Sequence, residues 1–150
     1  MAHNSITITP LVKNDISSVA KIAKSAEAYA WSERVFYDCL KADYHGWVLR
    51  KNGEILGFIV ILLQMQECQL LNIVVAPDQQ RKGYGYSLLK HAINFVKGRD
   101  AKKIILEVRA GNKAAIGLYK MLGCIEVGIR KNYYPCSTGR EDAHLFVLSI

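Results

Sequence analysis

The segment Gln80-Arg81-Lys82-Gly83-Tyr84-Gly85 combines two basic side chains with two glycines, as a loop that holds phosphate groups would. It follows an apolar run that ends in Ile73-Val74-Val75 and precedes an amphipathic run, so it joins a predicted strand to a predicted helix. At such a junction, free backbone N–H groups and the positive helix end can bind a pyrophosphate, and glycines let it approach closely. The alternative is a turn that uses glycine only for its geometry.

The glycine spacing excludes the two commonest nucleotide-binding loops. No Gly-Lys-Ser/Thr occurs, and the residue three positions after Gly85 is Leu88, so Gly-x-Gly-x-x-Gly is not completed either. We therefore expect neither nucleotide hydrolysis nor dinucleotide binding.

The elements that precede this loop are predicted from their apolar patterns. In order they are a strand over Ile6–Ile8, a helix capped by Asn14-Asp15, and a helix from Ser32 towards Leu40. Asn52-Gly53 favours a two-residue hairpin turn between strands at 47–50 and 55–63. A reversal near Met65 then leads to Leu70–Val75, an apolar strand predicted to lie buried at the centre of the sheet.

The elements that follow the loop alternate between helix and strand. A helix that ends near Gly98 and a strand over Lys103–Val108 imply a right-handed crossover, with this strand parallel to Leu70–Val75. A further helix over Asn112–Leu122 and closing strands at 124–129 and 145–148 complete the pattern. The sequence therefore predicts an α/β protein, with a mixed sheet covered by helices, in one domain over residues 1–150.

Composition narrows the classes of partner but does not choose among them. The net charge of +7 suits an anionic partner, such as nucleic acid, a ribosome or a phosphorylated cofactor, and it equally suits an ordinary basic surface. The four cysteines lack CxxC spacing and the histidines lack metal-ligand spacing, so we expect free thiols and no metal. Met1–Asn4 lack the pattern of a leader and the apolar run at 55–63 is too short to span a bilayer, so we expect a cytoplasmic protein.

Several motifs resemble those of a known superfamily. A strand ending in Ile73–Pro77, then Gln-x-x-Gly-x-Gly and an amphipathic helix, resembles the acetyl-coenzyme A (acetyl-CoA) signature of the GNAT acetyltransferases. A closer resemblance is to the RimI family, which acetylates the N-terminal alanine of a small-subunit ribosomal protein. It rests on Trp31-Ser32, Glu107–Ala110 with Asn112, Ala115–Tyr119, Leu122-Gly123, Arg130–Pro135 and Gly139–Ala143.

The resemblance implies the GNAT fold, an α+β type of α/β architecture. It has a mixed central sheet of about seven strands, and about four helices pack on both faces. It also implies acetyl-CoA as cosubstrate and a ribosomal protein N-terminus as substrate. We expect a monomer, with no direct nucleic-acid recognition and no membrane contact.

Two residues take catalytic roles by this resemblance. An α-amine is largely protonated at neutral pH, so its attack on a thioester needs a general base, and Glu107 has that role. Tyr119 is the general acid for the leaving thiolate. Read without the resemblance, Glu107 could equally form a salt bridge with Arg109, which strand alternation places on the same face, and Tyr119 could be a core aromatic.

The remaining predicted site residues bind the two substrates. The backbone of Ile73, Val74 and Val75 binds the pantetheine arm as an added strand would, and one N–H group polarises the acetyl carbonyl. Asn112 contacts the cofactor as the resemblance implies, or caps a helix, or does both. The full cofactor set is Ile73, Val74, Val75, Arg81, Lys82, Gly83, Tyr84, Gly85, Tyr86 and Asn112.

Aromatic residues are predicted to form the slot for the peptide N-terminus. The resemblance places Tyr133 and Tyr134 in its wall, in a turn before the last strand, with Trp31 on the opposite side. The alternative for the tyrosines is an ordinary surface turn. Two other functions stay open: acetylation of other N-termini, lysines or small amines, and a non-enzymatic module that senses acetyl-CoA or docks on RNA.

Overall fold

The computed structural model describes residues 5–150 as seven strands and four α-helices, with two short 3₁₀ turns. The strands form one sheet in the order β1-β2-β3-β4-β5-β7-β6. Their bounds are β1 Ile6–Pro10, β2 Tyr44–Lys51, β3 Glu54–Gln64, β4 Glu67–Val75, β5 Lys103–Arg109, β6 Ile125–Cys136 and β7 Gly139–Ser149. The helices are α1 Ile16–Ala26, α2 Glu33–Asp38, α3 Tyr84–Lys97 and α4 Lys113–Met121. The 3₁₀ turns are η1 Lys13–Asp15 and η2 Pro77–Gln79.

The first half of the sheet is antiparallel, as the hairpin signal predicts. Strands β1 to β4 pair in sequence order, and Asn52 and Gly53 both adopt positive φ at the β2–β3 turn. Two such residues in succession match the right-handed twist of the flanking strands. The turn thereby sets the pairing of Lys51 with Glu54, and a bulge between Leu49 and Arg50 shifts the register of the rest of β2 and β3.

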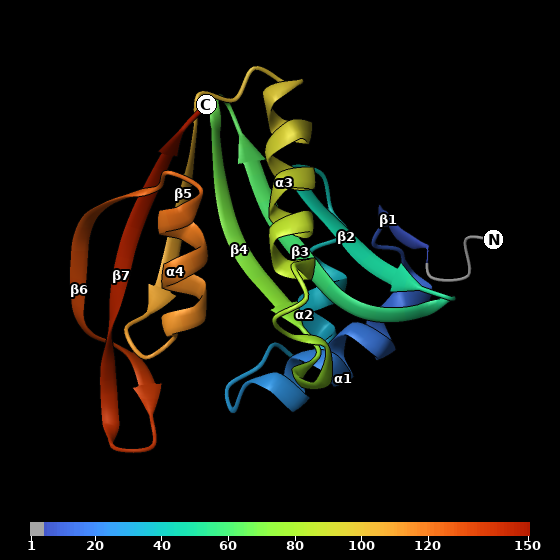
Figure 1. The fold of residues 1–150 in the computed structure, drawn as a ribbon, viewed down its shortest axis with the longest axis horizontal. Coiled ribbons are helices and arrows are strands. Elements are labelled where there is room, and N and C mark those ends of the chain that lie inside the picture. Colours follow the sequence, from blue (N-terminus) through green and yellow to red (C-terminus); the bar gives the residue numbers. More distant parts are fainter. Residues whose placement is uncertain (1–4) are drawn as a thin grey trace.

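Strands β4 and β5 are parallel, and α3 connects them, as the sequence predicts. Helix α3 buries the apolar stripe that defines its period, namely Leu88, Leu89, Ala92, Ile93 and Val96. This stripe packs on one face of the sheet within the larger core cluster. Figure 1 shows α3 lying along β3 and β4.

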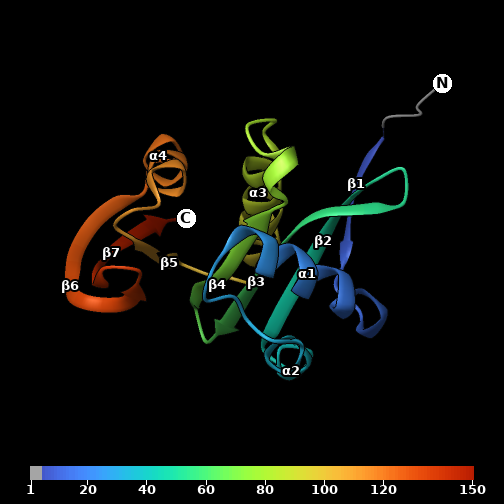
Figure 2. The ribbon, with the colours of Figure 1, turned by 90° about the horizontal axis from the view of Figure 1, so that it is seen from below.

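Helices cover both faces of the sheet. Figure 2 shows α1 and α2 on one face, with α3 and α4 on the other. Ile16, Val19 and Phe36 anchor the first pair in a second core cluster around Phe58 and Val74. The predicted fold class is therefore confirmed.

The predicted cap of α1 is wrong in its detail. Asp15 makes no side-chain hydrogen bond to the first turn of α1. Its carboxylate instead accepts the Val12 N–H at 3.1 Å and an Arg50 N–H at 2.6 Å. A buried carboxylate needs such partners, and here they tie the start of α1 to strand β2.

The C-terminal hairpin differs more from the prediction. Strands β6 and β7 are much longer than 124–129 and 145–148, and Tyr133-Tyr134-Pro135 lies within β6 and not in a turn. The pairing is irregular between Arg130 and Tyr134. Side chains of β7 hold this irregular stretch: Asp142 accepts the Asn132 N–H, and Arg140 donates to the carbonyls of Asn132 and Tyr133.

Candidate active site

The sheet opens between its two parallel strands. β4 and β5 pair only where residues 67–70 meet residues 103–106. Beyond that, β4 continues along β3, whereas β5 continues along β7, and the two strands diverge (Figure 1). An extended ligand could therefore pair with the free edge of β4 along residues 71–75.

A bulge lies where the strands begin to diverge. The β3–β4 register shifts between Val60 and Ile61, so that Leu71 is the extra residue of β4. A bulge bends its strand and increases its twist. Leu71, Asn72, Ile73 and Val75 are only half-buried, which corrects the prediction that the whole of Leu70–Val75 is buried.

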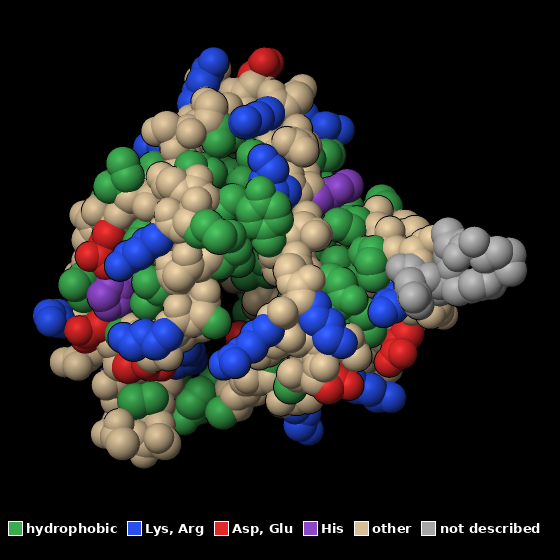
Figure 3. Space-filling model, in the orientation of Figure 1, with side chains coloured by type: hydrophobic (Ala, Val, Ile, Leu, Met, Phe, Trp, Pro, Cys, Tyr) green, Lys and Arg blue, Asp and Glu red, His purple; other side chains and the backbone are tan. Residues whose placement is uncertain are grey.

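The opening contains a cavity of about 180 Å³, which we call the central pocket. Figure 3 shows the surface hollowed between the regions that carry α3 and α4. The walls come from β4, β5, β6, α4 and the loop between α1 and α2. The lining residues are Glu27, Tyr29, Trp31, Leu70, Leu71, Asn72, Ile73, Glu107, Val108, Arg109, Asn112, Ala115, Tyr119 and Tyr134.

The two predicted catalytic residues both line this pocket. Glu107 lies on β5 and keeps 29% of its side chain exposed. Its carboxylate is 3.6 Å from an Arg130 guanidinium nitrogen. The predicted alternative, a pair with Arg109, does not form, because Arg109 binds Glu141 at 3.1 Å and the Pro135 carbonyl at 2.7 Å.

Tyr119 reaches the pocket from the inner face of α4. Only 3% of the residue is exposed, and its ring packs edge-on against Phe146. Burial is the main cause that raises the pKa of its phenol well above the ordinary tyrosine value, and Cys124, Tyr134 and Glu27 add to the shift. The hydroxyl is therefore protonated at neutral pH, as a proton donor must be.

The structure confirms the capping role of Asn112. It is the N-cap of α4, where its side-chain oxygen accepts the Ala115 N–H at 3.2 Å. It also lines the central pocket. Of the predicted backbone ligands on β4, Ile73 lines the pocket, while Val74 and Val75 continue the same strand towards the glycine loop.

The glycine loop, Gln80–Gly85, has the local geometry of an anion site. Gly83 is the N-cap of α3 at φ +84°, and Arg81 also has positive φ. The first backbone N–H groups of a helix have no intrahelical partners, so they can bind an anion. Arg81, Lys82 and Tyr86 are exposed, while Tyr84 packs partly against the core. The loop lies outside the central pocket, at the carboxyl end of β4.

The predicted substrate residues divide into two groups. Trp31 and Tyr134 line the pocket from opposite segments of the chain, with Trp31 packed edge-on against Phe36. Tyr133 is 41% exposed and does not line the pocket, although its ring contacts that of Tyr134 edge-on. Within the irregular stretch of β6, only the second tyrosine thus faces the cavity.

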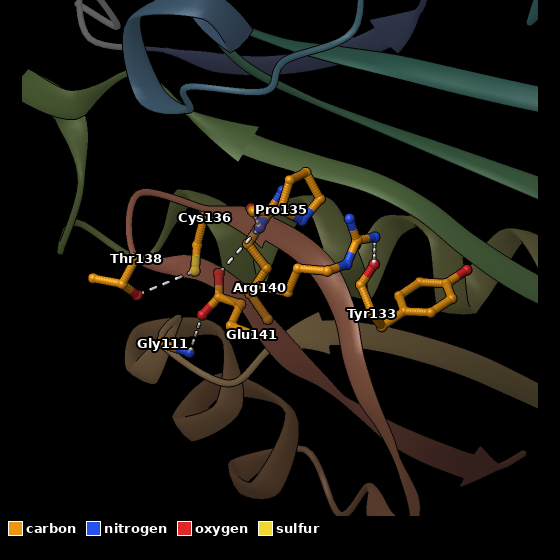
Figure 4. Close-up of polar contacts among 8 residues, drawn as sticks. Gly111, Tyr133, Pro135, Cys136, Thr138, Arg140 and Glu141 are labelled. Atoms are coloured by element: carbon orange, nitrogen blue, oxygen red, sulfur yellow. Dashed lines mark hydrogen bonds and ion pairs between the residues drawn. The ribbon is translucent and has the colours of Figure 1, made fainter.

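Arg109 connects three walls of the pocket, which the sequence did not predict. Its guanidinium lies over the rings of Tyr134 at 4.5 Å and Tyr29 at 5.5 Å. Glu141 accepts from Arg109 and, with its other oxygen, from the Gly111 N–H; Figure 4 shows this carboxylate pointing at Gly111. The arginine therefore links β5, the α1–α2 loop and the β6–β7 hairpin.

Glu27 and Tyr29 are pocket residues that sequence reasoning missed. Both follow α1 in a connecting loop, where an acidic or aromatic residue carries no periodic signal. Glu27 as a whole is exposed, but partial burial of its carboxyl raises the pKa of Glu27 above the ordinary value, and the nearby charge of Arg109 offsets part of that rise.

Other kinds of site are not indicated by the part of the chain that the structure describes. Residues 5–150 contain no group of three or more His, Cys, Asp or Glu side chains arranged to hold a metal. The helices in that range are all too short or too polar to cross a membrane. The four cysteines are free, and three of them are buried.

Comparison with known proteins identifies the family to which the chain belongs. Residues 16–124 match the Acetyltransferase (GNAT) family. The chain belongs to the GNAT acetyltransferases. It is 41% identical over 144 residues to the [ribosomal protein bS18]-alanine N-acetyltransferase of Escherichia coli K12, covering 96% of this chain and 97% of that protein. The corresponding Salmonella typhimurium enzyme is 39% identical with the same coverage.

Solved structures agree with this assignment. The crystal structure of the Escherichia coli ribosomal-protein-S18-alanine N-acetyltransferase superposes with a TM-score of 0.93 at 40% identity, over 97% of this chain and 94% of that one. Arabidopsis thaliana NAA60, solved in complex with acetyl-CoA, shares the fold at a TM-score of 0.86 and 19% identity, over 97% and 99% of the two chains. GNAT enzymes use acetyl-CoA as acetyl donor, and this chain is a GNAT acetyltransferase of the RimI type.

Proposed function

We propose that this acetyltransferase moves the acetyl group of acetyl-CoA directly to the N-terminal α-amine of a protein, with the N-terminal alanine of ribosomal protein bS18 as its substrate. The observation that carries the proposal is the central pocket, which brings Glu107 and Tyr119 together where β4 and β5 diverge. Identity of 41% to enzymes named for that reaction supports the choice of substrate.

The proposed path of acetyl-CoA follows strand β4. The glycine loop binds the pyrophosphate through the first N–H groups of α3, and Arg81 and Lys82 add positive charge. The pantetheine arm pairs with the free edge of residues 73–75, and Asn112 contacts it from α4. The thioester then enters the pocket between β4 and β5.

The proposed chemistry needs one base and one acid. Glu107 takes a proton from the α-amine, whose nitrogen attacks the thioester carbon and forms a tetrahedral intermediate. A backbone N–H of β4 stabilises the oxyanion. As the carbon–sulfur bond breaks, Tyr119 gives its proton to the leaving sulfur. The second proton of the amine nitrogen then returns Tyr119 to its neutral form, and a neutral amide remains on the substrate. No covalent enzyme intermediate is required.

The proposed peptide slot lies on the side of the pocket away from α4. Trp31 and Tyr134 form its walls, and Tyr133 supports Tyr134 by its edge-on contact. Arg109 fixes the position of Tyr134 through its stacking and its bond to the Pro135 carbonyl. A slot of this kind admits the first residues of a peptide.

We further propose that residues 1–150 act as one monomeric domain in the cytoplasm, where ribosomal proteins are made.

A peptide panel tests the proposal. Short peptides that begin with alanine should be acetylated on the α-amine, much faster than a blocked peptide with a free lysine side chain or a polyamine. Mass spectrometry of each product locates the acetyl group. Equal rates on the lysine side chain and on the N-terminal alanine would reject the proposed substrate class while leaving the GNAT assignment in place.

A further inference from the structure

Glu27 occupies an electrostatically unfavourable position that the proposed reaction does not use. It is the C-cap of α1, where its N–H binds the Ala23 carbonyl. The carboxyl end of a helix carries partial negative charge, so a carboxylate there is repelled. The side chain also lines the central pocket, although the residue as a whole remains exposed to solvent.

Within the described part of the chain, Arg109 compensates the charge of this carboxylate only in part. None of the salt bridges within residues 5–150 includes Glu27. The charge of Arg109 lowers the pKa of Glu27, but the Arg109 guanidinium binds Glu141 and the Pro135 carbonyl. A charged side chain that lies at an unfavourable helix end, with no salt bridge to compensate it, is characteristic of a functional position.

The surroundings of Glu27 favour a cation. The rings of Tyr29, Trp31 and Tyr134 line the same pocket, and those of Tyr29 and Tyr134 already attract one cation, the guanidinium of Arg109. Glu107 adds a second carboxylate. An acidic side chain, a negative helix end and aromatic rings together form a receptor for a positively charged side chain.

We propose that Glu27 is a specificity-determining residue that binds a lysine or arginine side chain at the second or third position of the substrate. This inference rests on the proposed function, since it assumes that the peptide enters between the α1–α2 loop and β6. The N-terminal alanine of the substrate lies beside Glu107 during acetylation. The side chains of the residues that follow it pass Glu27 where the peptide leaves the pocket. The enzyme would then prefer N-termini that are followed by basic residues.

Paired peptides test this inference directly. Three peptides begin with alanine and differ only at the second residue, as lysine, serine or glutamate, and a second series varies the third residue. In one of the two series the lysine peptide should have a kcat/KM at least fivefold above that of the glutamate peptide, mainly through KM. Fivefold corresponds to ~1 kcal/mol, as expected for a solvent-accessible ion pair.

Variants assign the preference to this side chain. Glu27→Gln should bring the lysine-to-glutamate ratio close to one, and Glu27→Lys should invert it. Glu33→Gln is the matched control, because Glu33 lies on α2 and lines a different cavity. It should leave the ratio unchanged. Misfolding of Glu27→Lys would lower the rates with all peptides and could not invert the lysine-to-glutamate ratio of kcat/KM. An inverted ratio therefore reports on peptide recognition and not on stability.

The results distinguish the two proposals. If no alanine peptide, including the serine one, is acetylated, the proposed function fails. If all are acetylated but the wild-type ratio is one in both series, or Glu27→Gln leaves the ratio unaltered, only the role of Glu27 is overturned.

Discussion

Replacement of Glu107 by glutamine separates the chemistry of the site from its stability. The substitution keeps the shape of the side chain and removes its charge. Glu107 contacts Arg130 at 3.6 Å, and the two side chains are 29% and 53% exposed. A pair so open to solvent is worth at most ~1 kcal/mol, so we expect the melting temperature to fall by no more than ~4 °C.

The catalytic effect should be much larger than that. A general base contributes roughly 10²- to 10⁴-fold to rate, which corresponds to ~3–5 kcal/mol of activation free energy. We therefore expect Glu107→Gln to lower kcat with an alanine peptide by at least a hundredfold. The affinity for acetyl-CoA should change little, because the glycine loop lies outside the pocket that holds Glu107.

The assay combines release of the coenzyme A thiol, calorimetric binding of acetyl-CoA and thermal unfolding. It also includes a series of pH values. An α-amine with an ordinary pKa of about 8 is mostly neutral at pH 9, so the deficit of the variant should be smaller there than at pH 7. A kcat within fivefold of wild type, or a deficit that does not change between pH 7 and 9, would refute the role of Glu107 as base.

Further predictions address the acid, the sheet, helix α4 and the glycine loop. Tyr119→Phe should lower kcat about a hundredfold while keeping the ring against Phe146. Because burial raises the pKa of Tyr119 above its unfolded value near 10, wild-type stability should hold below pH 10 and decline above it. Melting curves from pH 9 to 11 should show a smaller decline in Tyr119→Phe, and an identical one would contradict this. Gly57→Ala should destabilise the protein by ~1–3 kcal/mol, since its Cβ would lie 2.8 Å from the Val74 carbonyl oxygen. Gly117→Ala should stabilise α4 by up to ~1 kcal/mol, because the added Cβ would have no atom within 4 Å. Denaturant unfolding of the Gly57→Ala and Gly117→Ala variants measures both changes in stability. Gly83→Ala should weaken acetyl-CoA binding at least fivefold, because a side chain is strained at φ +84°, whereas Gly117→Ala should leave calorimetric affinity unchanged.

The elements with strong periodic signals could be predicted from the sequence. The Asn52-Gly53 hairpin, the apolar stripe of α3 and the parallel β4–β5 pair follow from local patterns together with the handedness of crossovers. Their packing in the structure agrees with what those patterns require. Sequence was sufficient here because each local preference agrees with the fold.

The β6–β7 hairpin could not be predicted in the same way. The sequence predicts a turn at Tyr133-Tyr134-Pro135, before the last strand. In the structure, β6 continues through this stretch because Asp142 on the facing strand binds the irregular backbone. Partners of this kind depend on cross-strand register, which a local pattern does not reveal.

The ion-pair partner of Arg109 across the pocket could not be predicted from the sequence either. Strand alternation correctly places Glu107 and Arg109 in the wall of one pocket, but it does not indicate that Glu141 on β7 is the better partner for the arginine. The bulge at Leu71, which begins the opening of the sheet, also depends on the pairing of β4 with β3. Glu27 lies in the site because the loop that follows α1 passes beside the pocket, and no sequence pattern indicates the course of that loop.

The most direct test of the proposed reaction uses the whole substrate. Purified enzyme, acetyl-CoA and bS18 with a free N-terminal alanine are combined, and the product is analysed by intact mass and by fragmentation. We predict the gain of one acetyl group, located on the α-amine of the alanine, and little or no gain with Glu107→Gln. Acetylation confined to lysine side chains, or an unmodified bS18 alongside an enzyme that binds acetyl-CoA, would contradict the proposal.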